Sequence, residues 1–129
     1  MYSAQTALAQ YKKIGTQSAV EGASPHRLIQ MLMEGALERM NAARAAFEND
    51  DIEKKGIMLG KAISIIGGLQ NSLDEARSPD LVANLDSLYD YMQRRLLEAN
   101  SRNDMSMVAE VCDLLSEVKS SWDQIAPAA

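Results

Sequence analysis

The sequence is poor in the residue types that catalysis and metal binding need. Its 129 residues include one histidine, His26, and one cysteine, Cys112. A single cysteine cannot form a disulfide within the chain, and zinc or paired-metal sites need several Cys, His or Glu-x-x-His ligands. Gly67-Gly68 and Gly60-Lys61 lack the spacing of a phosphate-binding loop. We therefore expect a protein that is not an enzyme, with no catalytic residues, no metal and no cofactor.

Long hydrophobic runs and an excess of basic residues are absent as well. The apolar runs are a few residues long, so we expect no membrane insertion. The start of the chain lacks a secretory signal pattern, and the apolar neighbours of Cys112 predict a buried thiol; both favour the cytoplasm. The net charge is −5; residues 1–20 contain Lys12 and Lys13 and no acid, so the remainder carries −7. An acidic body disfavours nucleic acid and anionic membranes as partners.

Aromatic residues are scarce, and alanine, leucine, methionine and isoleucine supply most of the apolar content. Such a composition favours helices over sheets. Apolar residues recur every three or four positions over residues 25–47, 51–76, 79–100 and 104–125. Ser24-Pro25 and Ser78-Pro79 are helix start signals, and Asp51 and Asp104 are candidate caps.

Four long helices joined by short loops predict an all-α, antiparallel four-helix bundle over residues 24–126. In the third helix, Leu81, Leu85, Leu88, Met92 and Leu96 are predicted to face inward. Residues 1–23 are expected to form a short, mobile N-terminal arm or helix, with Leu8, Tyr11 and Ile14 as its apolar anchors. Residues 127–129 are expected to be a frayed tail.

The predicted helices carry more apolar surface than four helices need to cover one another. Projected at about 100° per residue, the apolar arcs of the first, second and fourth helices span roughly 180°, 160° and 220°, whereas a bundle helix needs somewhat more than about 100°. This surplus has three interpretations: a wide core, a groove for amphipathic partner helices, or the interface of a homo-oligomeric adaptor. A histidine phosphotransfer domain is a further alternative. It is disfavoured because His26 is predicted to be a surface residue in the first turn of its helix.

The chain resembles the flagellar export chaperone FliS along essentially its whole length. The residues that carry the resemblance are Met1-Tyr2-Ser3-Ala4, Tyr11, the run from Ala23 to Leu32, Lys61-Ala62-Ile63-Ser64-Ile65-Ile66, the run from Asn84 to Met92, Leu96-Leu97-Glu98-Ala99-Asn100, and Trp122. Met33-Glu34-Gly35 departs from the pattern, because the family usually has an aromatic residue and an aspartate before this glycine.

The resemblance implies a cytosolic export chaperone. It would bind the C-terminal helical segment of flagellin, prevent premature polymerisation, and keep flagellin competent for type III flagellar secretion. It also implies that the arm with Leu8, Tyr11 and Ile14 caps the binding groove until the client displaces it. Other flagellar export proteins are possible further partners, and Arg94-Arg95 is either a contact for them or a solvated basic pair.

The client-binding residues predicted on this basis come from three helices, and for each of them plain core is the alternative. They are Ile57, Met58, Ile65, Leu69, Tyr91, Met92, Leu97, Leu114 and Val118. Tyr89 is predicted to be core. Tyr91, about 200° further round the same helix, is predicted at a groove edge with its hydroxyl in water.

Overall fold

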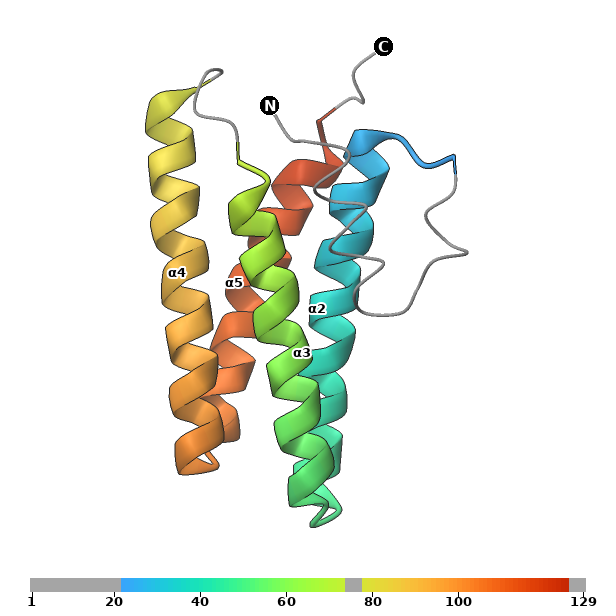
Figure 1. The fold of residues 1–129 in the computed structure, drawn as a ribbon, viewed down its shortest axis with the longest axis vertical. Coiled ribbons are helices and arrows are strands. Elements are labelled where there is room, and N and C mark those ends of the chain that lie inside the picture. Colours follow the sequence, from blue (N-terminus) through green and yellow to red (C-terminus); the bar gives the residue numbers. More distant parts are fainter. Residues whose placement is uncertain (1–21, 74–77, 126–129) are drawn as a thin grey trace.

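The computed structural model describes residues 22–73 and 78–125, and within them every regular element is an α-helix. The helices are α2 (Pro25–Glu48), α3 (Ile52–Asn71), α4 (Pro79–Arg102) and α5 (Met105–Asp123). Consecutive helices run antiparallel, and α2 and α4 each contact both α3 and α5 (Figure 1). The predicted all-α four-helix bundle is confirmed. The N-terminal arm with Leu8, Tyr11 and Ile14 lies outside the described residues.

Three of the four helix starts carry a side-chain cap, as the sequence predicts. Ser24 Oγ accepts from the Arg27 amide at 3.1 Å, and Asp51 Oδ1 accepts from the Lys54 amide at 3.0 Å. Asp104 accepts from the Ser106 amide at 3.0 Å. Ser78 is different: it precedes Pro79 at the start of α4, but its side chain makes no capping hydrogen bond. The Ser-Pro pair therefore marks both boundaries and caps only one of them.

Two of the turns between helices each contain one residue with a positive φ angle. Asp50, between α2 and α3, and Asn103, after α4, have the positive φ angles of 59° and 53°, a conformation that Asn and Asp tolerate better than most residues. α3 ends at Asn71, before the predicted Ala76. There the Ser72 hydroxyl donates to the Gly68 carbonyl at 2.9 Å, and the Ser72 amide also bonds within this last turn. The hydroxyl and the amide of Ser72 thus both donate hydrogen bonds to carbonyl groups in the last turn of α3.

The core is built mainly from Leu, Ile, Met and Ala side chains of all four helices. Tyr89 is fully buried, as predicted, and the buried Cys112 thiol lies 3.9 Å from the sulfur of Met40. The buried residues of α4 are Tyr89, Met92, Leu96 and Ala99, so the first ten residues of this helix contribute none. The core therefore covers only the second half of α4.

A buried lysine joins α3 to the end of α4. Lys55 is buried, and its ammonium donates to the Asn100 carbonyl at 3.1 Å and to Asn103 Oδ1 at 2.5 Å. A cation at a helix C-terminus interacts favourably with the carbonyl dipoles there. The neighbouring Gly56 faces the side-chain amide of Asn100, and a Cβ at this position would lie 3.7 Å from Asn100 Oδ1, an ordinary van der Waals distance. This contact fixes α4 against α3 at the end where α4 meets α5.

The two Ser-Pro helix starts provide a matched test of capping. Ser24→Ala removes an observed capping bond and should lower the free energy of unfolding by about 1 kcal/mol. Ser78→Ala removes no such bond and should change it by less than about 0.5 kcal/mol. Urea denaturation followed by circular dichroism measures both. Equal losses for the two variants would contradict the assignment of Ser24 as the side-chain cap.

Candidate protein-binding surface

The structure separates the nine predicted client-binding residues into three groups. Ile65, Leu69 and Met92 are fully buried in the core, so for these three the core alternative holds and they offer no accessible surface. Ile57 and Leu97 are 49% and 64% exposed. The remaining four are half-buried: Met58, Tyr91, Leu114 and Val118.

The two exposed members of the set lie on different faces of the bundle. Leu97 is one turn after Gln93, whose side chain donates to Gln70 of α3 at 2.7 Å, so Leu97 lies on the α3 side of α4. Gly56 faces Asn100 of α4. Ile57 is about 100° further round α3 from Gly56 and so points away from α4. Ile57 and Leu97 therefore point in different directions.

A larger set of partly exposed apolar residues lies on the first half of α4, on the second half of α5 and in the turn after α5. Leu81 and Ile125 are 55% and 52% exposed. Leu85, Leu88, Leu114 and Val118 are half-buried and pack on the edge of the core. We call these six residues the α4–α5 apolar surface.

These side chains have the helical phase of core residues. At about 100° per residue, Leu81, Leu85 and Leu88 all lie within about 40° of the buried Met92. They point toward the bundle interior, as the sequence predicts, yet Leu81 is more than half exposed. The prediction of direction was right, and the implied burial of Leu81 was wrong. The sequence pattern within α4 does not distinguish a buried inward-facing residue from an exposed one, because burial depends on where α5 lies.

The position of α5 follows from its contacts with α2. In Figure 1, α4 and α5 are close where their loop joins them; toward the other end they separate, and α5 leans toward the beginning of α2. There the rings of His26 and Trp122 stack with centroids 4.7 Å apart and an angle of 16° between planes. Trp122 Nε1 donates to the His26 carbonyl at 3.0 Å, and His26 Nε2 donates to the Trp122 carbonyl at 2.9 Å. His26 is thus half-buried and paired, and its prediction as a surface residue was wrong.

Polar contacts extend this attachment of α5 to α2. Gln30 donates to Asp123 at 2.9 Å, and the Lys119 ammonium lies 2.7 Å from Asp123 and 3.8 Å from Glu34. Hydrogen bonding from Lys119 lowers the pKa of the Asp123 carboxyl. The end of α5 is therefore held on α2 by a stacked ring pair and by charged and amide groups. Because α5 lies against α2 here, the helices that the structure describes cover the first half of α4 only in part.

At mid-bundle a polar cluster connects α4 with α5. The Tyr91 hydroxyl donates to Glu110 at 2.5 Å, and Arg95 Nε donates to the same carboxylate at 2.7 Å. The bond from Tyr91, and then that from Arg95, lowers the pKa of Glu110. The Tyr91 hydroxyl is therefore bound to protein, which corrects the prediction that it lies in water. Arg94 pairs with Asp90 at 2.9 Å, so neither arginine is merely solvated.

The α4–α5 apolar surface consists of aliphatic side chains. Among residues 22–73 and 78–125, no three His, Cys, Asp or Glu side chains are grouped so that they could hold a metal ion. Within the same part of the chain, no helix is long and apolar enough to cross a membrane. A partly exposed aliphatic surface of this kind can contact another apolar surface.

Similar known proteins belong to one family. The model of the flagellar protein FliS family matches residues 7–129. The chain belongs to the FliS family. FliSB of Pseudomonas aeruginosa is 53% identical over 122 residues, which cover 95% of this chain and 97% of the relative. FliS of Salmonella typhimurium is 45% identical over 130 residues, covering 100% and 96% of the two chains. FliS of Vibrio cholerae is 44% identical over 117 residues, covering 91% and 86%.

Each of these FliS relatives is named a flagellar secretion chaperone. The resemblance to FliS inferred from the sequence is therefore confirmed, and so is the assignment to a family of chaperones, which is not a class of enzymes. FliS family membership says nothing about which residues bind a client. For that question the accessible apolar residues described above are the guide.

The Tyr91–Glu110–Arg95 cluster predicts a pH-dependent contribution to stability. The pKa of Glu110 is lower in the folded chain than in the unfolded chain. Its contacts therefore stabilise the fold above the unfolded pKa of about 4.3, and this contribution is lost as the pH falls through the folded pKa. We expect Glu110→Gln to be less stable than wild type at pH 7 and the difference to shrink below about pH 4. Urea denaturation at constant ionic strength measures this.

The matched control for this experiment is Glu117→Gln on the same helix. Glu117 is exposed and makes no ion pair with any described residue. Its replacement should leave the dependence of stability on pH close to that of wild type. A stability difference for Glu110→Gln that stays constant from pH 7 to pH 3 would contradict the assigned role.

Proposed function

We propose that this protein is a cytosolic export chaperone that binds the C-terminal helical segment of flagellin. Binding prevents premature polymerisation and keeps flagellin competent for type III flagellar secretion. The observation that carries the proposal is the α4–α5 apolar surface, whose α4 side chains have the helical phase of core residues and yet are only partly covered by the described helices. The flagellar secretion chaperones among the relatives supply the class of client.

An amphipathic client helix fits the α4–α5 apolar surface. Its apolar stripe would cover the partly exposed leucine, valine and isoleucine side chains, as a fifth helix would. Completing the burial of six half-exposed aliphatic side chains stabilises the complex by about 1 kcal/mol each. A client that is disordered beforehand loses conformational entropy when it folds on the surface, which offsets part of this gain. Micromolar affinity corresponds to about 8 kcal/mol, so we infer that further contacts contribute.

The length of the bundle indicates where those contacts lie. α2 and α4 are each 24 residues long, which corresponds to about 36 Å. A client segment of about forty residues would be about 60 Å long as one helix, so it cannot lie along a single face. We propose that it turns and reaches a second face, where Ile57 or Leu97 is available. We also propose that Leu8, Tyr11 and Ile14 cover part of the client surface until client binds.

The first test is titration calorimetry of the full chain with a peptide that covers about forty C-terminal residues of the flagellin from the same organism. We expect stoichiometric binding, a negative heat-capacity change, and a gain in helicity by circular dichroism. No binding at tens of micromolar by the folded protein would refute the proposal. If the chain then forms stable dimers in ultracentrifugation, a homo-oligomeric adaptor is the better account of the exposed apolar residues.

The second test locates the client surface with three charge insertions at exposed positions: Leu81→Glu, Leu97→Glu and Ile57→Glu. All three side chains are about half exposed or more in the free chain, so each variant should retain its melting temperature. We expect Leu81→Glu to weaken peptide binding at least tenfold and the other two to weaken it less. If Leu81→Glu binds the peptide with wild-type affinity and Leu97→Glu binds it much more weakly, the client binds on the α3 side of α4 instead.

A further inference from the structure

The charges around the α4–α5 apolar surface are almost all of one sign. The two halves that form it are residues 79–93 of α4 and residues 111–125, which contain the second half of α5. These segments contain six acidic residues and one basic residue: Asp80, Asp86, Asp90, Asp113, Glu117 and Asp123, against Lys119. Lys119 is occupied on the other side of α5, where it contacts Asp123 and Glu34. Asp123 lies on that side as well, so the remaining charges of these two segments are five carboxylates.

Three of these carboxylates make no ion pair with a described residue, and two of the three border the surface; the third, Asp113, lies about 100° round α5 from Leu114. Asp86 accepts from Gln70 on the α3 side, and Asp90 pairs with Arg94. Asp80 and Glu117 are exposed and make no ion pair with any residue that the structure describes. They are the candidates for a partner's positive charge.

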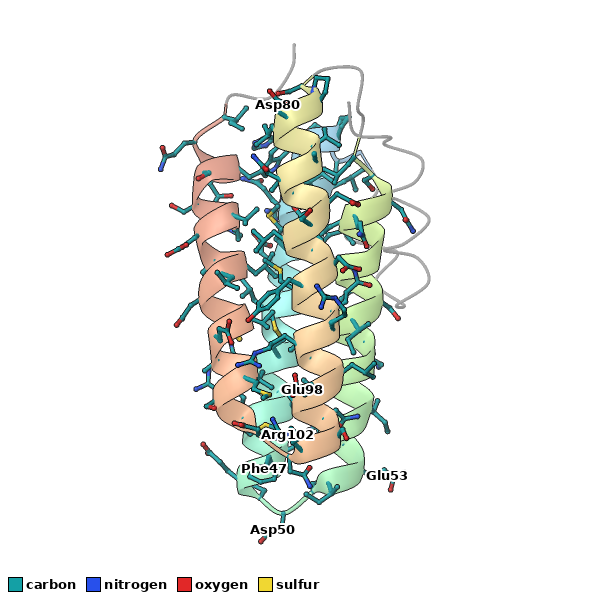
Figure 2. All side chains as sticks on the ribbon, turned by 90° about the vertical axis from the view of Figure 1, so that its left-hand side faces the viewer. Phe47, Asp50, Glu53, Asp80, Glu98 and Arg102 are labelled. Atoms are coloured by element: carbon teal, nitrogen blue, oxygen red, sulfur yellow. The ribbon has the colours of Figure 1, made fainter. Side chains whose placement is uncertain are left out.

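The helical repeat places both residues between α4 and α5. Glu110 and Tyr91 bond to each other across these helices. Glu117 follows Glu110 by seven residues, two turns, and Asp80 precedes Tyr91 by eleven, close to three turns. Each therefore lies on the edge of its own helix that faces the other helix. Figure 2 shows Asp80 at the end of α4 that is far from Arg102 and the loop to α5.

We propose that the α4–α5 apolar surface selects amphipathic helices that carry a lysine or arginine beside their apolar stripe. The inference rests on the proposed function and specifies the chemistry of its client. Lysine and arginine can lay their aliphatic stems on the apolar residues while their charged ends reach the border. The same border repels acidic helices, which matters in a chain with a net charge of −5.

Glu117 is the residue on which the inference depends. Asp80 lies in the first turn of α4, where a carboxylate also stabilises the helix N-terminus. Glu117 is in the middle of α5, where the macrodipole offers no such role. Its side chain is exposed, so its replacement leaves the core unchanged. A change in binding on its replacement therefore reports on the partner's charge.

The test uses the full chain and two designed amphipathic helical peptides. They share one apolar stripe and differ only in lysine or glutamine at the positions that flank it. Their dissociation constants are measured by calorimetry at about 50 mM and about 500 mM salt. Wild type should prefer the lysine peptide about threefold to tenfold at low salt, and screening should reduce this preference at high salt. Equal affinity of wild type for the two peptides at low salt would overturn the inference.

Variants identify the carboxylate and separate this inference from the proposed function. Glu117→Gln should reduce the lysine preference, and Glu117→Lys should abolish it. Glu53→Gln, which removes the same charge at the opposite end of the bundle (Figure 2), should retain it. With the flagellin peptide, Glu117→Lys should bind about fivefold to tenfold more weakly than wild type. Unchanged flagellin affinity would refute the charge inference alone; a lysine preference without flagellin binding would refute the flagellin proposal alone.

Discussion

At one end of the bundle, His26 and Trp122 stack, and each donates a side-chain hydrogen bond to the other's backbone carbonyl. This double contact joins the first turn of α2 to the last turn of α5. At this end α5 leans toward α2 and away from α4 (Figure 1). The apolar residues in the first half of α4 therefore stay accessible, although their helical phase is that of a core.

The contacts that hold α4 lie at the middle and at the opposite end of the bundle. The Tyr91–Glu110–Arg95 cluster connects α4 with α5, and Lys55 anchors the end of α4 on α3. α4 is thus well held in its second half and lightly covered in its first. A chaperone has to combine a stable fold with an apolar surface that a client can reach. In the proposed function, the second half of α4 serves the stability of the fold, and its first half serves client binding.

Much of the architecture was predictable because it depends on residues close in sequence. The helices follow from apolar spacing, and three of the four starts follow from local caps such as Ser24 and Asp51. The failures involve contacts between distant residues. Tyr91 was placed in water because its partner Glu110 lies on another helix. Leu69 was assigned to a client surface because an arc of apolar residues does not show where the core ends and an open face begins.

The sequence by itself determined the fold class, the helix phases, the family and hence the class of function, since composition, periodicity and motif order are properties of the chain read in one dimension. The tertiary structure decided which apolar residues are accessible. Leu81 and Met92 have nearly the same phase on α4, yet one is exposed and the other fully buried. The difference comes from the path of α5. That path is fixed by the contact between His26 and Trp122, which are 96 residues apart along the chain.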